Sequence, residues 1–360
     1  MHKNHIRELQ EFLKGELEER SIVAMPDFFL DRFMNLDRDV NAFARNLRSA
    51  TRKKGGSIDG IKQREFRGGN AVNTASALSM LGAKVTPIVC TDKLGLQILQ
   101  LYLDPNKTDL SHVKIRDRAS ITTAMEFETE NGKANVMIRS LGSLSDFGPQ
   151  DLNDSDWAAI ENANYVCLFN WAGTRRFGTS LAQTVFRRNK NKGKGKTYYD
   201  TADPTPNSPK IPELMKTVLQ DKHLDVLSLN ENEAICYANQ LDKNAGKLRK
   251  DQRFEETAGK AAKILAAHLP ARIDLHTTSF STTFTKKAET TVPAFRVPVL
   301  RATGAGDAWN AGNIVGDAYG LSNGCRLTLA NAIAAYYVSN PEGEHPTRKK
   351  LAKFLKTSKT

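Results

Sequence analysis

The chain has 360 residues, of which 40% are hydrophobic and 26% charged, an ordinary balance for a globular protein with a large buried core. Its formal net charge of +12 favours attraction to anions such as nucleotides and phosphorylated metabolites. The basic residues are scattered apart from runs at 48–54 and 187–196, which lack interleaved aromatic residues and argue against nucleic-acid binding. Four well-separated cysteines form no C-x-x-C pair and indicate neither a zinc site nor a disulfide framework.

Residues 1–20 are expected to be an N-terminal helical extension, because apolar residues recur there at helical spacing. This segment contains no apolar core typical of a secretion signal. Because no run approaches the length of a membrane span, we expect a cytoplasmic protein with no membrane partner. Residues 21–25 read as a buried strand, and alternation in the following segment places Asp31 on the same side as Asp27.

The next segments predict a small sheet that stands apart from the main body. A basic helix over 41–54 precedes a loosely alternating run at 58–66 that is typical of an edge strand. Residues 120–139 read as a hairpin around Asn131-Gly132, the strongest local hairpin signal in the chain. Such a sheet suits a lid, because closing it would exclude water from a reacting phosphoryl group.

Two glycine-rich segments each lead into a predicted helix. In the first, Gly68 and Gly69 allow close backbone approach, and Asn70 or Asn73 can cap the helix or recognise hydroxyl groups. The second runs from Thr303 through Gly304, Ala305, Gly306 and Asp307. Its glycines and its helix start form an anion cradle, and Asp307 beside it can act as a base for a substrate hydroxyl. A turn with a capping aspartate is the alternative interpretation of the second segment.

From residue 146 onward, strands alternate with helices, which predicts βαβ units and a mostly parallel sheet covered on both faces. The expected strands are 165–170, 197–201, 225–229 and 272–277, and the expected helices are 179–188, 211–219 and 257–268. Ligands bind beyond the carboxyl ends of such strands. Asn230 and Glu233 lie there, where Glu233 would hold a hydrated Mg²⁺ and Asn230 a phosphate or the metal shell, unless both only cap a helix.

Three motifs, in this order and spacing, resemble those of the ribokinase-like carbohydrate kinases, also called the PfkB family. They are Gly68-Gly69-Asn70-Ala71-Val72-Asn73, Asn230-x-x-Glu233 and Thr303-Gly304-Ala305-Gly306-Asp307. Residues 91–95 look like the family's G-x-D-x-x-G with Cys90 in place of the first glycine, and residues 200–206 look like a drifted D-P-N-P stretch. The resemblance covers about residues 21–345 and leaves 346–360 as a basic C-terminal helix or tail.

The resemblance implies an α/β fold, namely a three-layer α/β/α sandwich with a mostly parallel central sheet and a small β-sheet lid from about 27–67 and 110–140. It implies ATP and Mg²⁺ as cofactors and assigns roles to matching residues. Asp307 would be the base, and the amides of Gly304, Ala305 and Gly306 would stabilise the transferring phosphoryl group. Asp31, Gly69 and Asn73 would bind the sugar; Asn230, Glu233 and Thr303 would organise metal and phosphates, and Asn331 would lie near the adenine.

Three departures from the family pattern stand out. Arg301 and Ala302 replace Asp-Thr before the second glycine-rich motif, where the first Asp helps some members bind a monovalent cation. We hypothesise that Arg301 supplies a fixed positive charge there and removes any need for potassium. Residues 276–281 lack the glycines usual near the nucleotide, which puts purine preference in question. Residues 41–60 and the N-terminal helix exceed the pattern and either enlarge the lid or mediate homodimer contacts.

The resemblance predicts ATP-dependent phosphorylation of a sugar hydroxyl. Arg139, after the hairpin, either faces a carboxylate or phosphate of the substrate or lies on the surface. A sugar kinase is therefore favoured over a 2-keto-3-deoxygluconate-type sugar-acid kinase and over a nucleoside kinase. A non-catalytic sensor of nucleotide or sugar is the alternative from another class, and the retained Asp307 argues against it.

Overall fold

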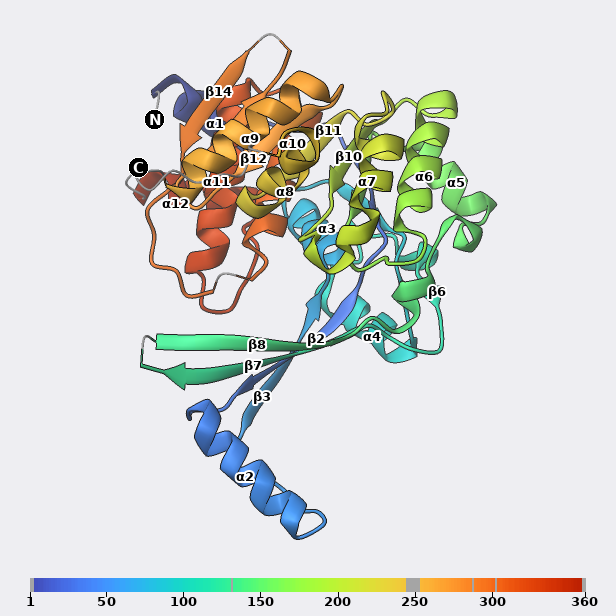
Figure 1. Ribbon diagram of the computed structural model, residues 1–360. Helices are drawn as coiled ribbons and strands as arrows, with labels where there is room; N and C mark the ends of the chain where they lie inside the picture. The colour runs from blue at the N-terminus through green and yellow to red at the C-terminus, as the bar shows by residue number, and fades with distance from the viewer. Residues whose placement is uncertain (1–2, 131, 244–252, 287, 302, 358–360) are drawn as a thin grey trace.

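The computed structural model describes residues 3–130, 132–243, 253–286, 288–301 and 303–357. Asn131, Ala302 and the last three residues of the predicted tail lie outside these ranges. The chain forms a large α/β body from which a small sheet and one helix extend (Figure 1). Within the described ranges, no helix combines the length and apolar character needed to cross a membrane.

The body is built on one eight-stranded sheet, parallel except where β13 and β14 form an antiparallel hairpin at one edge. Alternate residues of β9 pack into different cores, with Val166 and Leu168 on one face and Tyr165 and Cys167 on the other. In spatial order the strands are β14 (Glu289–Pro293), β13 (Phe280–Phe284), β12 (Arg272–His276), β11 (Val226–Leu229), β10 (Lys196–Asp200), β9 (Tyr165–Phe169), β1 (Ser21–Met25) and β4 (Lys84–Pro87).

Helices cover both faces of this sheet, which confirms the three-layer sandwich. One core contains residues of α5 (Asp154–Asn162), α6 (Gly178–Lys192), α7 (Ile211–Leu214, continued as a π turn over Met215–Leu219), α8 (Glu231–Leu241) and α9 (Phe254–His268). The other contains residues of α1 (Lys3–Lys14), α3 (Asn70–Met80), α4 (Lys93–Tyr102), α10 (Ala305–Ala318), α11 (Asn323–Ser339) and α12 (Arg348–Thr357).

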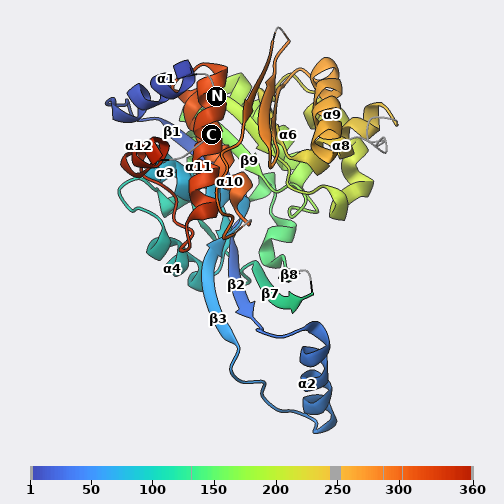
Figure 2. The ribbon, with the colours of Figure 1, turned by 90° about the vertical axis from the view of Figure 1, so that its left-hand side faces the viewer.

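The small sheet has the strand order β3 (Lys62–Gly68), β2 (Phe29–Asn35), β7 (Ile121–Thr129) and β8 (Gly132–Ser140). It stands below the body, and α2 (Val40–Arg52), which joins β2 to β3, reaches furthest away (Figure 2). Asp39 begins α2 by accepting hydrogen bonds from the backbone N–H groups of Asn41 and Ala42. A short pair of strands, β5 (Cys90–Thr91) and β6 (Lys114–Ile115), lies apart from both sheets.

Two elements differ from the sequence-based expectation. The first helix ends at Lys14 rather than near residue 20, because Gly15 follows and favours termination. The hairpin of β13 and β14 lies outside the predicted elements. Thr282 and Thr283 of β13 are buried in the sheet although they are polar. Because this segment shows neither an apolar run nor strict alternation, the sequence pattern does not predict a strand there.

Candidate active site

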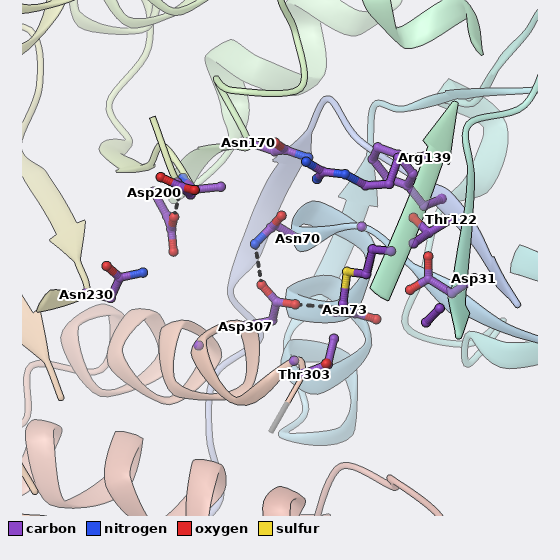
Figure 3. A pocket seen from close by; sticks show the side chains of 18 of the residues that line it. Asp31, Asn70, Asn73, Thr122, Arg139, Asn170, Asp200, Asn230, Thr303 and Asp307 are labelled. Carbon is purple, nitrogen blue, oxygen red and sulfur yellow. Dashed lines mark hydrogen bonds between the residues drawn. The ribbon is translucent and has the colours of Figure 1, made fainter. Parts of the chain in front are cut away.

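A cleft of about 280 Å³ opens at the carboxyl ends of β10, β11 and β12, where the N-terminus of α10 meets the small sheet (Figure 3). In open α/β sheets, ligands bind at this edge, beyond the carboxyl ends of the strands. The cleft brings together ten residues predicted from the sequence: Asp31, Gly69, Asn73, Arg139, Asn230, Glu233, Thr303, Gly304, Gly306 and Asp307.

The N-terminus of α10 offers backbone N–H groups to the cleft. Gly304 precedes the helix in the left-handed region at φ 88°, and a β-carbon there would lie 2.6 Å from the Tyr337 hydroxyl. No side chain in the described ranges caps this helix end. The first N–H groups of α10, beginning with that of Ala305, therefore have no side-chain acceptor in the described chain, and uncapped N–H groups at a helix start are suited to binding an anion.

Asp307 is buried in the first turn of α10, with its side chain held by two amides from α3. The Nδ2 of Asn70 donates to Oδ1 at 2.9 Å, and the Nδ2 of Asn73 donates to Oδ2 at 3.0 Å (Figure 3). Burial raises the pKa of Asp307 well above its usual value, and these two hydrogen bonds oppose that rise. The carboxyl is thereby oriented and available as a proton acceptor.

Buried Asp27 fixes the position of the two asparagines. Its carboxylate accepts from the backbone N–H groups of Asn70 and Ala71, each at 2.8 Å, at the start of α3. Gly69 has a φ of 94°, and a β-carbon there would lie 2.9 Å from the Asp27 carbonyl oxygen. A β-carbon at Gly68 would collide with the Asp31 carboxylate. Both glycines are therefore needed for the close approach of β3 and α3 to β2.

Three strands of the small sheet place a row of polar side chains on the wall of the cleft. Asp31 on β2 is the register partner of Thr122 on β7, which in turn is the partner of Arg139 on β8. Burial raises the pKa of Asp31 to about 7, against the lowering effects of Thr122 and Arg139. This carboxyl therefore changes its charge near neutral pH.

Asn230 and Glu233 both cap α8 and line the cleft. The Oδ1 of Asn230 accepts from the Glu233 backbone N–H at 3.0 Å, and the Glu233 carboxylate accepts from the Asn230 backbone N–H at 3.0 Å and from its amide at 2.8 Å. Both side chains thus cap the helix, as the alternative interpretation predicts, and both also line the cleft beyond the carboxyl end of β11. Burial, with the nearby charge of Asp200, raises the pKa of Glu233 well above its usual value.

Carboxyl groups crowd this end of the cleft. Asp200 and Asp203 line it together with Glu233 and Asp307. Asp200 accepts from the Asn310 amide at 2.6 Å, and burial raises its pKa. In the part of the chain that the structure describes, no group of three or more His, Cys, Asp or Glu residues is arranged to bind a metal directly. The donor set therefore fits a hydrated cation that other ligands help to coordinate.

Comparison with known families identifies the chain. The sequence pattern of the pfkB family carbohydrate kinases matches residues 35–350. The chain belongs to this family. Comparison with curated protein sequences finds no match.

Several solved kinases share the fold of this chain. Arabidopsis thaliana ribokinase, complexed with ribose and ATP, superposes with a TM-score of 0.70 at 18% identity, covering 95% of this chain and 100% of that one. The Methanocaldococcus jannaschii nucleoside kinase gives 0.66 at 17% identity, covering 95% and 99%. Fructokinase from Xylella fastidiosa with bound ATP gives 0.67 at 15% identity, covering 94% and 99%. The pfkB-family chain thus has the ribokinase fold.

Two residues singled out from the sequence lie away from the cleft of this pfkB-family chain. Asn331 on α11 is buried, where it accepts from the Ser281 hydroxyl at 2.6 Å and the Trp309 indole at 2.9 Å and donates to the Pro293 carbonyl at 3.1 Å. Its side chain is therefore engaged in packing α10 and α11 against the β13–β14 hairpin. Arg301 lines a neighbouring cavity.

The cleft also contains Asn170, which no motif includes, and Asp200 and Asp203, to which no role was assigned from the sequence. Asp200 ends β10 and His276 ends β12, so position at the carboxyl edge of a parallel sheet is the signal that could have identified both. His276 packs against Trp309 in a tilted arrangement with ring centroids 4.8 Å apart, and burial lowers its pKa to about 4, so the imidazole is neutral.

Proposed function

We propose that this pfkB-family protein transfers the γ-phosphoryl group of ATP to a hydroxyl group of a sugar or sugar derivative, with Mg²⁺ as cofactor. One observation carries the proposal: the buried carboxyl of Asp307 lies in the first turn of a helix whose N-terminal N–H groups are left uncapped by any described side chain. A base and an anion cradle within one helical turn are what phosphoryl transfer to an alcohol requires.

In this reaction the acceptor binds between the small sheet and α3, with Asp31, Asn73 and Arg139 contacting its polar groups. Asp307 takes the proton of one hydroxyl, and the resulting oxygen attacks the γ-phosphorus. The bond from this phosphorus to the bridging oxygen breaks, and ADP leaves. The N–H groups at Ala305 and Gly306 donate to the equatorial oxygens of the phosphoryl group as their charge develops.

The carboxyl-rich end of the cleft supports the assignment of Mg²⁺. The metal supplies charge neutralisation for the phosphates. Glu233 and Asp200 would accept hydrogen bonds from its water ligands, since each carboxylate oxygen has lone pairs beyond those used by Asn230 and Asn310. Thr303 and Asn230, which line the cleft, would contact the phosphates.

A panel assay tests this proposal. ATP consumption is measured against hexoses, pentoses, sugar acids, sugar phosphates and nucleosides, with Mg²⁺ and with chelator. We expect turnover that depends on both the acceptor and Mg²⁺. Acceptor-independent ATP hydrolysis would argue against it, and binding without any turnover would instead favour the non-catalytic sensor. Preferential phosphorylation of a nucleoside would instead support the alternative function of a nucleoside kinase.

We also propose that the chain forms a homodimer through the small sheet. The strand β8 is an edge strand, and Val136 and Ile138 on it are 47% and 59% exposed. Exposed apolar residues on an unpaired edge favour association with another surface. Light scattering after size-exclusion chromatography tests this, with a dimeric mass expected for the natural chain and a monomeric mass for Ile138→Lys. A monomeric natural chain at micromolar concentration would refute it.

A further inference from the structure

A second cavity, of about 920 Å³, adjoins the acceptor end of the cleft. The two share four lining residues, Asp31, Phe33, Asn73 and Thr303. One of these, Asn73, also donates a hydrogen bond to Asp307. A single molecule can therefore place one hydroxyl at Asp307 and another group in the second cavity.

Arg67, near the end of β3, brings a positive charge into this cavity. Its guanidinium donates to the Ser76 hydroxyl at 2.7 Å and to Nδ1 of His345 at 3.2 Å. Its Nε is buried and has no hydrogen-bond partner among the residues that the structure describes. No described carboxylate pairs with it. Its guanidinium also lies 5.7 Å from the centroid of the Tyr102 ring, and burial lowers its pKa while the charge of Asp307 opposes that change. A partly buried guanidinium with no carboxylate in direct contact favours an anion beside it.

His345 provides a second donor. It is only 4% exposed, and its Nδ1 accepts from Arg67, since a guanidinium can only donate. Burial and the charges of Arg67 and Arg301 lower the pKa of His345 well below its usual value, so the ring is neutral and its one proton lies on Nε2. Within the described ranges this buried Nε2 has no partner. His345 thus lines the cavity and has a ring N–H group for which the described chain provides no acceptor.

Arg301 adds a second guanidinium. It lies over the rings of Phe66 and Tyr337, at 5.9 and 5.8 Å from their centroids, and donates a hydrogen bond to the Pro341 carbonyl at 3.4 Å. Carboxylates also line the cavity, namely Asp31, Glu126, Glu342 and Glu344. Glu342 and Glu344 are exposed, and Glu344 already pairs with Lys350 at 2.7 Å. Asp31 interacts with Thr122 and Arg139, and no described hydrogen bond or ion pair joins a carboxylate to Arg67 or to His345.

We propose that the second cavity binds a carboxylate or phosphate group of the acceptor, so that the preferred substrate is a sugar acid or a sugar phosphate rather than a neutral sugar. The inference rests on the proposed kinase activity and narrows its substrate class. Charge-assisted hydrogen bonds from arginine are the strongest that a protein offers to such groups. A free anion such as inorganic phosphate shares this chemistry, and the test separates the two sources.

The experiment compares matched acceptors that differ only in the anionic group, such as an aldose with its aldonic acid and with its phosphate ester. The kcat/KM of each is measured for the natural chain, Arg67→Gln and the control Arg64→Gln, which removes the same charge from an exposed position on the same strand. Binding of inorganic phosphate is followed separately by calorimetry. Thermal unfolding checks each variant, and Arg301→Gln provides a second test if Arg67→Gln does not fold.

We expect one anionic acceptor to exceed its neutral counterpart at least tenfold in kcat/KM. Arg67→Gln should abolish this preference for the anionic acceptor, and Arg64→Gln should retain it. Phosphate should compete with the anionic acceptor. If every anionic acceptor has the same kcat/KM as its neutral counterpart while phosphate binding depends on Arg67, the cavity binds a free anion. That result would overturn the assignment of the cavity to the acceptor. If no acceptor is phosphorylated, the proposed function fails, but Arg67-dependent phosphate binding would still support the anion site and its absence would overturn it.

Discussion

Replacing Asn70 with alanine removes one of the two amides that hold Asp307, and its effect can be worked out from the structure. The lost hydrogen bond, 2.9 Å long, joins a part-buried amide to a buried carboxylate. Such a bond to a charged group contributes about 1.5–3 kcal/mol. Because one pKa unit corresponds to about 1.4 kcal/mol, the pKa of Asp307 should rise by about one to two units in Asn70→Ala. The direction follows because this bond favours the ionised form.

The assay is kcat/KM as a function of pH, measured by ADP release with the best acceptor. In Asn70→Ala, the acidic limb of the kcat/KM profile should move to higher pH. At a pH below the acidic limbs of both the natural chain and the variant, kcat/KM of the variant should be about tenfold to a hundredfold lower. Asn162→Ala, which truncates an exposed amide on α5, is the control and should leave the profile unmoved. A lower rate with an unshifted limb, or a limb moved to lower pH, would refute the assigned role of Asn70.

Three further predictions concern the neighbouring groups. The KM for the acceptor should fall as pH rises through about 7, because ionised Asp31 accepts hydroxyl hydrogen bonds and the protonated form does so less well; Asp31→Asn should abolish this dependence, and an unaltered dependence would exclude Asp31 as its source. Gly69→Ala should destabilise the fold by about 2 kcal/mol or more, because its φ of 94° and the 2.9 Å approach to the Asp27 carbonyl oxygen both oppose a β-carbon; an unchanged unfolding midpoint would contradict that geometry. Replacing sodium by potassium should leave activity within about twofold, because the Arg301 guanidinium already donates to the Pro341 carbonyl; strong activation by potassium would refute the fixed-charge hypothesis.

The glycine-rich motifs were predictable because each encodes a local backbone requirement. Gly69 and Gly304 both adopt positive φ at a helix start, and each lies where a β-carbon would meet a neighbouring atom. A sequence displays such requirements directly, since few other residues satisfy them. The parallel sheet was predictable for a similar reason, because buried apolar runs alternate with helices of ten or more residues.

Features that depend on contacts between distant segments were not predictable in the same way. Asp27 appears in the sequence as a lone acid after a strand, and only the fold brings the N-terminus of α3 onto its carboxylate. The family resemblance predicts that Asn331 lies near the adenine, yet packing directs its amide into a network with Ser281 and Trp309. The pairing of Arg67 with His345 joins residues 278 positions apart.

Phosphoryl transfer with Asp307 as the base is tested most directly by single-turnover measurement of ATP cleavage with Asp307→Asn and saturating acceptor. Asp154→Asn, which neutralises an exposed carboxylate in the first turn of α5, is the matched control. We predict a fall in rate of about 10²–10⁴ for Asp307→Asn, with little change in acceptor binding, and an unchanged rate for the control. A rate for Asp307→Asn equal to that of the natural chain would contradict the assignment of the base.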